Sequence, residues 1–254
     1  MVVSMPAQLN SATLSVGQLA ERYRREMIPL SKTFSYCSPE FPLTEEDIKE
    51  YLEEPIAALP AAISSKLPKV SILLVPYLDK GTNKAGEMVV NEKPTKDRLL
   101  WTSRVVSREE AVFAFAMKEQ EVADYHYRFY HLLAALVADQ WGDVVRRQYS
   151  LLVREEINSS VHGEVDDESW RLKQALLRRQ STVQRDTKVF REYARQSFID
   201  TLTLFMHGIC CDIDVETGPR QLPSRYLRKR LQLLQSLYPP PEGYAVFPDE
   251  LNRQ

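Results

Sequence analysis

Glycine is scarce in this chain, with only 8 glycines among 254 residues. This is about 3%, against a usual ~7%. Folds built on glycine-rich phosphate loops or on many tight turns need more glycine, so a mainly helical fold is favoured. No P-loop, G-x-G-x-x-G or G-x-S-x-G motif occurs, and no residue stands out as a nucleophile or general base. The sequence therefore favours a non-catalytic protein, with an enzyme as an open alternative.

Cysteine is also too sparse for a disulfide framework. Cys210 and Cys211 are adjacent, and Cys37 lies far from both in the sequence. This usage favours reduced thiols and a cytoplasmic location. The N-terminal residues lack the features of a secretory signal, and no run of 18 apolar residues occurs, so we expect no contact with a membrane. We also expect no cofactor.

The apolar pattern predicts a mainly α fold with a small antiparallel β element. Residues 69–78 are short, apolar and β-branched, as a buried strand would be. Residues 87–90 and 99–106 are the other two strand candidates, with turn-forming residues before the first of them. Shorter helices are expected near 15–28 and directly after Thr44, which has the character of an N-cap.

From Ser107 onward the chain is expected to be helical. Ser107 and Glu110 have the spacing of a capping box, and one apolar face continues to about Ile157, with a break near Trp141. A second long helix is expected to end near Gly208, so that the two form an antiparallel hairpin. The expected divisions are 1–106 with short helices and the small sheet, 107–238 with the hairpin and a C-terminal helix, and 239–254 as a proline-rich tail.

The most basic segment is 171–196, with eight basic and only two acidic residues. On one helical wheel, six of the basic residues fall on an arc about 140° wide, away from the apolar side. At ~1.5 Å per residue this stripe would be roughly 35 Å long, comparable with one turn of duplex nucleic acid. The last helix adds more basic residues. Together the candidates for binding a nucleic acid or an acidic partner are Lys173, Arg178, Arg185, Lys188, Arg191, Arg195, Arg225, Arg228 and Lys229.

The same stripe also fits the solvated face of a helix whose charge is balanced elsewhere. The formal net charge is −2, and residues 155–168 contain six acidic residues and no basic lysine or arginine. Aromatic residues suited to stacking on bases are absent from the stripe, so any nucleic acid would be contacted at its phosphates.

A metal site has only weak candidates. The segment HGICCDIDVE offers His207, Cys210, Asp212 and Asp214, but it has no C-x-x-C pair and no EF-hand spacing. A helix end followed by a polar loop explains it as well. Upstream, His126 lies in an aromatic segment for which we expect a packing role. The sequence therefore assigns no metal.

The function expected from these patterns is a cytoplasmic, non-catalytic interaction or scaffold subunit that uses long helical surfaces. We expect a protein partner, and a homo-oligomer is compatible with the sequence. The first alternative is a nucleic-acid-binding subunit that contacts phosphates through the basic stripe. The second is a metal-dependent enzyme that uses His207, Cys210 and Asp212, or a histidine from a helix core.

Overall fold

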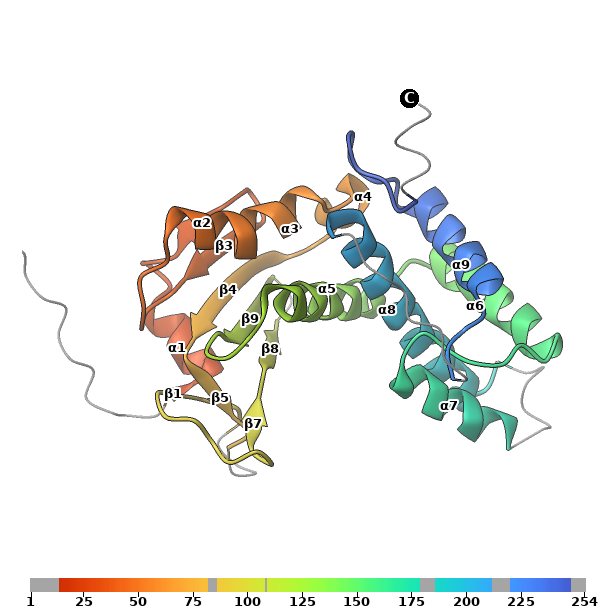
Figure 1. Ribbon diagram of the computed structural model, residues 1–254, viewed down its shortest axis with the longest axis horizontal. Helices are drawn as coiled ribbons and strands as arrows, with labels where there is room; N and C mark the ends of the chain where they lie inside the picture. The colour runs from red at the N-terminus through yellow and green to blue at the C-terminus, as the bar shows by residue number, and fades with distance from the viewer. Residues whose placement is uncertain (1–13, 82–85, 108, 179–185, 212–219, 248–254) are drawn as a thin grey trace, which may run out of the picture. The chain divides into compact units, whose positions relative to one another are not determined.

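The computed structural model describes residues 14–81, 86–107, 109–178, 186–211 and 220–247 (Figure 1). The fold is 50% helix and 17% strand, with one sheet of four strands and another of five. It is therefore a mixed α+β fold, and our prediction of a mainly α fold with one small β element is wrong. The described residues form two compact units. One unit runs to Thr44 and from Pro68 to Gln120, and the other contains Glu45–Leu67 and the residues from Glu121 onward.

The five-stranded sheet forms the centre of the first unit. Its central strands run parallel, and a short antiparallel strand lies at each edge. The residues of β4 and β9 are buried apart from the first of each strand. Strands with both faces covered have continuous apolar sequences, as these two do. In spatial order the strands are β2 (Ile28–Pro29), β3 (Phe34–Cys37), β4 (Lys69–Val75), β9 (Glu110–Ala116) and β8 (Thr102–Val106).

Strand β9 occupies a segment that we expected to be helical. A short apolar run can form either a buried strand or a buried helix, and periodicity alone does not separate the two. Ser107 and Glu110, which we expected to cap a helix, instead form a turn between β8 and β9. The Ser107 amide donates to the Glu110 carbonyl at 2.8 Å, and the Ser107 hydroxyl accepts from the Glu110 amide at 3.1 Å. The helical segment therefore begins only at Val122.

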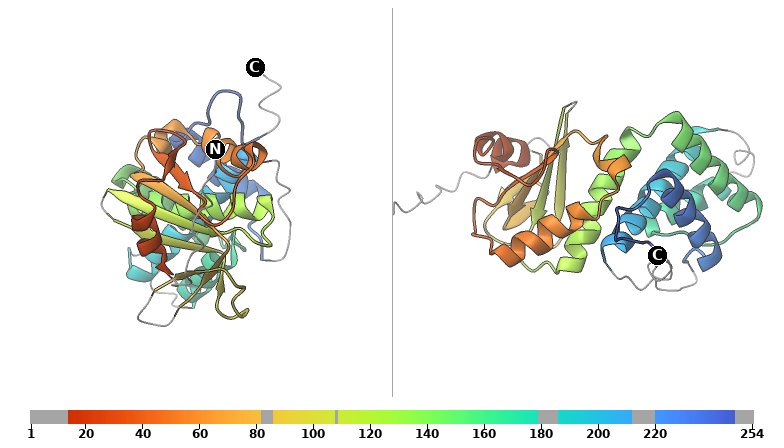
Figure 2. Two further views of the ribbon diagram at one scale, coloured as in Figure 1. Left: turned by 90° about the vertical axis from the view of Figure 1, so that its left-hand side faces the viewer. Right: turned by 90° about the horizontal axis from the view of Figure 1, so that it is seen from above.

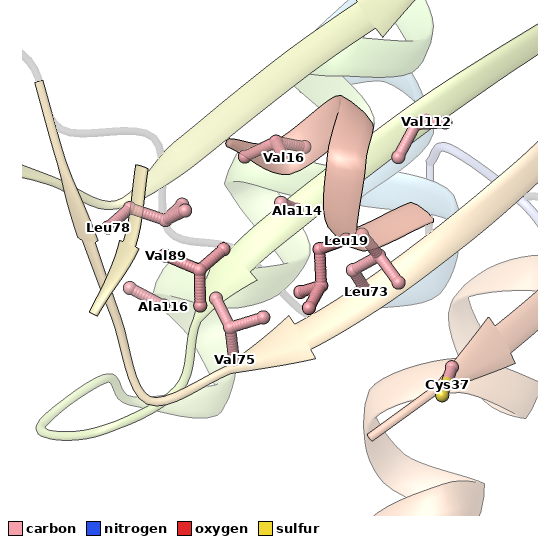
Figure 3. Close-up of a cluster of buried hydrophobic side chains, with 10 residues drawn as sticks. All are labelled: Val16, Leu19, Cys37, Leu73, Val75, Leu78, Val89, Val112, Ala114 and Ala116. Atoms are coloured by element: carbon pink, nitrogen blue, oxygen red, sulfur yellow. The ribbon is translucent and has the colours of Figure 1, made fainter. Parts of the chain in front are cut away.

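The four-stranded sheet of the first unit is antiparallel throughout, in the order β1 (Leu14–Ser15), β6 (Met88–Val90), β5 (Tyr77–Asp79) and β7 (Leu99–Leu100). The strand candidates of the sequence are thus divided between two sheets. Helix α1 (Val16–Arg22) begins at a capping box formed by Ser15 and Gln18. Its Val16 and Leu19 lie in the same apolar cluster as side chains of β4, β5, β6 and β9 (Figure 3).

The second unit is helical, with α8 as its most buried element. Fifteen residues of α8 are buried, and α5, α6, α7 and α9 all contact it (Figure 2). The predicted break near Trp141 is confirmed, because one helix ends at Asp139 and the next begins at Asp143. The helical segments are α2 (Glu45–Ile48), the π-helical turn η1 (Lys49–Glu53), α3 (Glu54–Ala57), α4 (Ala61–Ser64), α5 (Val122–Asp139), α6 (Asp143–Asn158), α7 (Asp167–Leu177), α8 (Lys188–Cys210) and α9 (Ser224–Leu237). Among the described residues, we find no helix with both the length and the apolar character needed to cross a membrane.

A charge-balanced network is buried between α6, α7, α8 and α9. The Arg230 side chain is fully buried and pairs with Glu156 at 2.6 Å and with Glu164 at 2.8 Å. Lys173 approaches the other oxygen of Glu164 at 3.2 Å, and the Tyr193 hydroxyl donates to the same carboxylate. Two cations therefore face two anions, as buried charges require. We call these five residues the buried charge network.

Candidate metal centre

Three metal-ligand side chains meet in the helical unit. His126 comes from the second turn of α5, Cys210 is the last residue of α8, and Cys211 follows it. One ligand atom from each residue lies within 4.8 Å of the other two, and the His126 Nδ1 is 3.2 Å from the Cys211 Sγ. Two thiolates bound to one Zn²⁺ at ~2.3 Å in a tetrahedral site are about 3.8 Å apart. A nitrogen and a sulfur on the same ion are ~3.6 Å apart, so shifts of about 1 Å, outward for the His126–Cys211 pair, would bring the three atoms to coordination distances.

The backbone at the end of α8 allows adjacent cysteines to share one site. Successive side chains on a helix diverge by about 100°. Cys211, however, has left the helix, with φ −125° and ψ 144°, so its side chain does not follow the helical spiral. Its amide still bonds to the His207 carbonyl at 2.8 Å, which fixes the end of the helix. The direction of the Cys211 side chain is therefore set by the cap.

The His126 ring is oriented by a bond on its other side. The Nε2 atom lies 2.8 Å from the backbone carbonyl of Glu50, in η1. A carbonyl can only accept, so this contact places the proton on Nε2 and leaves Nδ1 with a free lone pair toward the sulfurs. Histidine ligands of metals commonly have such a partner on the second nitrogen. His126 is also buried, which restricts its side chain further.

The two thiols influence one another's ionisation. A hydrogen bond from Cys211 lowers the pKa of the Cys210 thiol, with a further contribution from the Tyr130 hydroxyl. The same bond and burial raise the pKa of Cys211. The pair therefore loses its first proton more readily than an isolated thiol and holds the second more tightly. A bound cation would favour loss of both, because thiolates are the ligand form.

His207 lies one turn before the cysteines but outside the group of three ligands. It is 7% exposed, and its Nε2 has no hydrogen-bond partner among the described residues. Its ring lies between the rings of Tyr127 and Tyr130, with centroid distances of 6.1 Å to each. Burial lowers the pKa of His207 to about 4, and the neighbouring His126 contributes to the shift. The imidazole is therefore neutral at physiological pH.

The structure places the metal candidates of the sequence in different ways. Cys210 lies in the group, His207 lies beside it, and Asp212 and Asp214 are outside the described residues. Sequence reasoning missed Cys211 and the pairing with His126, which is 85 positions away. The neighbouring Cys210–Cys211 dipeptide was the signal available in the sequence. Which histidine would face it depends on how α5 and α8 pack.

The basic stripe is not carried by a single helix. Helix α7 ends at Leu177 and α8 begins at Lys188, so the wheel drawn through 171–195 does not apply. Lys173 is buried in the charge network. Arg178 is exposed at the C-cap of α7, and Arg185 lies outside the described residues.

The remaining basic candidates in α8 each have an acidic neighbour. Lys188 is 3.7 Å from Glu192, Arg191 pairs with Asp186 at 3.4 Å, and Arg195 pairs with Asp139. These contacts reduce the positive potential that a phosphate backbone would meet.

Helix α9 has a different arrangement. Lys229 pairs with Glu155 at 3.0 Å, whereas Arg225 lies over the ring of Tyr226 and Arg228 lies over the ring of Phe247. Stacking on an aromatic ring does not neutralise the positive charge of either arginine. These two exposed arginines are thus the basic candidates of α9 that have no acidic partner among the described residues.

Comparisons with known proteins add no assignment. No known protein family, no curated protein and no solved structure matches this chain.

Proposed function

We propose that the helical unit binds one soft transition-metal ion, Zn²⁺ in the first instance, through His126, Cys210 and Cys211. The observation that carries the proposal is the convergence of one imidazole nitrogen and two sulfurs within 4.8 Å, from helices distant in the sequence. Imidazole and thiolate ligands select zinc or copper(I), whereas magnesium and calcium prefer oxygen ligands. The orientation of His126 by the Glu50 carbonyl supports the same chemistry.

In this proposal the ion has a structural role. It would join the N-terminal part of α5 to the C-terminal end of α8, with η1 holding the imidazole. The proposal places the protein in a reducing, cytoplasmic setting, because thiolate ligands require reduced cysteines, and all three cysteines are free thiols here. The described residues supply three ligands, so a tetrahedral ion would keep a fourth position for water or a further ligand. No other described group beside the site has a geometry that requires a catalytic role, and we propose a non-catalytic metal-binding subunit.

Metal analysis and titration test this proposal. The reduced chain of 254 residues, purified without chelators, should contain about one zinc per chain. Titration of the metal-free chain with Co²⁺ should give the charge-transfer absorption of thiolate ligands. His126→Ala, Cys210→Ser and Cys211→Ser should each weaken zinc binding by about 100-fold or more, since each removes a ligand.

Two residues outside the group serve as matched controls. Cys37 lies on β3 in the other unit, and His162 is exposed on the helical unit. Cys37→Ala and His162→Ala should leave zinc affinity within about twofold of wild type. Zinc affinity that is equal in the wild type and in all three ligand variants would contradict the proposal, as would reduced wild-type protein that takes up no zinc.

A second proposal retains the interaction role, with a second copy of the chain as the partner. On α6, Val144 and Leu151 are 68% and 60% exposed. They are seven residues apart and so lie on one face, with the spacing at which paired helices bury side chains. The exposed Arg147 lies between them. Because the same face can pair with itself around a two-fold axis, we propose that two α6 helices associate.

Sedimentation equilibrium tests the self-association. Wild-type protein should form dimers that persist at high salt, because the contact is apolar. Leu151→Glu should weaken dimerisation by tenfold or more, since it places a charge in the centre of the contact. Leu177→Glu, at a 39% exposed residue of α7, is the control. A wild-type chain that stays monomeric across the concentration range would refute this second proposal.

A further inference from the structure

A cavity of about 330 Å³ lies in the helical unit at the other end of α5 from the candidate metal centre. His126 is in the second turn of α5, and Leu136 lines the cavity from its last turns, roughly 15 Å further along at ~1.5 Å per residue. The volume is at the small end of the range for ligand pockets, and it holds about eleven groups of the size of a water molecule. The cavity therefore fits a small molecule.

The walls of the cavity are largely apolar and come from segments that are separate in the sequence. Ile63 and Leu67 line it from α4 and the residues after it, and Leu136 and Val145 line it from α5 and α6. Trp141, between those two helices, lines it as well, and its ring is held 4.7 Å from the ring of Phe198. Apolar walls of this kind favour a ligand with a hydrocarbon or aromatic body.

Tyr238 gives the cavity a polar group without a partner. This residue lines the cavity and is only 4% exposed, and its hydroxyl, which bonds to no described residue, is accessible from the cavity. Burial raises the pKa of Tyr238 to about 12, so the hydroxyl keeps its proton and can donate. Water or a ligand acceptor in the cavity would take this hydrogen bond.

The start of α6 provides further hydrogen-bond donors, the backbone amides of its first turn. Its N-cap is Gly142, which has no side chain to accept from the amides of the first turn. Uncapped amides at the start of a 16-residue helix favour an anion. Lys66 also lines the cavity and makes no ion pair within the residues that the structure describes. Asp143 lines the cavity as well, and its carboxylate is paired with Arg146 at 2.6 Å, which offsets part of its charge.

We infer that this cavity binds a small carboxylate with an apolar body, such as a medium-chain fatty acid or an arylalkanoic acid. The body occupies the space between Ile63, Leu136 and Trp141. The carboxylate accepts hydrogen bonds at the start of α6 and from Tyr238, with Lys66 supplying the opposite charge. A cation of the same shape has no acceptor for these donors and would be repelled by Lys66, and a neutral alcohol offers an acceptor without the opposite charge.

Calorimetric titration of the full chain with three eight-carbon probes tests the charge preference. Octanoate, octanol and octylammonium share the apolar body and differ in the head group. Octanoate should bind saturably with one site per chain and at least tenfold more tightly than octylammonium. Equal affinity for octanoate and octylammonium would overturn the inference, and so would the absence of saturable octanoate binding. Phenylpropionate in place of octanoate distinguishes an aromatic from an aliphatic body.

Two gentle substitutions locate the head group. Lys66→Met keeps the apolar stem, and Tyr238→Phe keeps the buried ring, so both variants should fold. Each should weaken octanoate binding three- to tenfold and leave octanol binding within twofold. Lys188→Met, at an exposed lysine of α8 outside the cavity, should change neither. Octanoate affinity unchanged in both Lys66→Met and Tyr238→Phe would place the carboxylate elsewhere and refute the inference.

Discussion

Replacing Arg230 with methionine tests how far the stability of the helical unit depends on its buried charge network. Methionine keeps the apolar stem and removes the guanidinium, which bonds to Glu156, Glu164 and Ser197. Glu164 would keep Lys173 at 3.2 Å, but Glu156 would lose the cation that pairs with it in the buried network. Because Glu156 is 1% exposed, the variant would bury an unbalanced carboxylate. Breaking a buried pair in this way typically costs about 3–5 kcal/mol.

The pKa of Glu164 shows how the contribution of the network's cations depends on pH. Burial alone would raise its pKa, but the charge and hydrogen bonds of Arg230, with Lys173, lower the pKa to about 2 from an ordinary 4.5. A difference of about 2.5 pKa units corresponds to about 3 kcal/mol. The folded pKa lies below the unfolded value, so this stabilisation is present above about pH 4.5 and is lost as the pH falls toward 2. The free-energy difference between wild type and Arg230→Met should therefore shrink in acid.

Urea unfolding followed by far-ultraviolet circular dichroism measures this loss at pH 7 and pH 3. The double variant Arg230→Met/Glu156→Met leaves Lys173 and Glu164 as a balanced pair, so it should recover most of the stability that the single variant loses. Lys229→Met, at the neighbouring exposed position of α9, should cost less than about 1 kcal/mol. A double variant as unstable as Arg230→Met, or a single variant that loses less than about 1 kcal/mol at pH 7, would refute the reasoning.

Three further predictions concern buried groups of the helical unit. Burial raises the pKa of Asp200 to about 7, so the folded state holds a proton that the unfolded state has released. Stability should therefore fall as the pH rises from 5 to 8, and thermal unfolding of Asp200→Asn should show a smaller fall. Gly163 has φ +82°, and an added Cβ would lie 2.1 Å from the Gln221 carbonyl oxygen. Gly163→Ala should lower the urea midpoint by the equivalent of about 2 kcal/mol or more, and an unchanged midpoint would contradict a left-handed backbone in close contact with Gln221. The buried Tyr149 hydroxyl donates to the Ser197 carbonyl at 2.8 Å. Tyr149→Phe should cost about 1–2 kcal/mol in the same assay, whereas Tyr226→Phe, at a half-buried ring of α9, should cost less.

Local patterns in the sequence predict several elements of the structure well. The β-branched run at 69–75 forms β4, and the break between α5 and α6 follows from the Trp141–Gly142 pair. These features depend on residues that are close together in the sequence, such as the β-branched residues of β4 or Gly142 between α5 and α6. Pairing between distant strands has no such local signal. The parallel register of β4 and β9, with Leu73 opposite Ala114, joins residues about forty positions apart.

The failed prediction of a helix from Ser107 has the same origin. The sequence EAVFAFA has no polar residue after Glu110, so it shows neither the period of a helix nor that of a half-buried strand. Its state is decided by β4 on one side and β8 on the other, which supply the backbone hydrogen-bond partners. A tertiary contact thus determines the secondary structure, and no property of the segment alone could.

The candidate metal centre depends on tertiary packing in a second way. Cys210 and Cys211 are visible in the sequence, but His126 is one of four histidines with no local distinction. Its selection requires that the start of α5 meet the end of α8 and that η1 offer the Glu50 carbonyl to the second ring nitrogen. The packing of α5 against α8 sets the distance between the ligands, and the Glu50 carbonyl fixes the tautomer of His126.

The basic stripe shows why a helical wheel can mislead when a helix is interrupted. A wheel assigns a side chain to a face only if every residue before it is helical, and α7 and α8 are separate helices. The angular positions of Lys188 and Arg191 therefore cannot be carried over from α7, and the position of Lys173 within α7 places it in the core. What decides the environment of a cation here is the segment that faces it: Lys173 and Arg230 face the buried carboxylate of Glu164, whereas Arg228 faces the ring of Phe247. A nucleic-acid hypothesis would thus have to rest on the exposed arginines of α9, and binding that is unchanged by Arg225→Glu and Arg228→Glu would remove that basis as well.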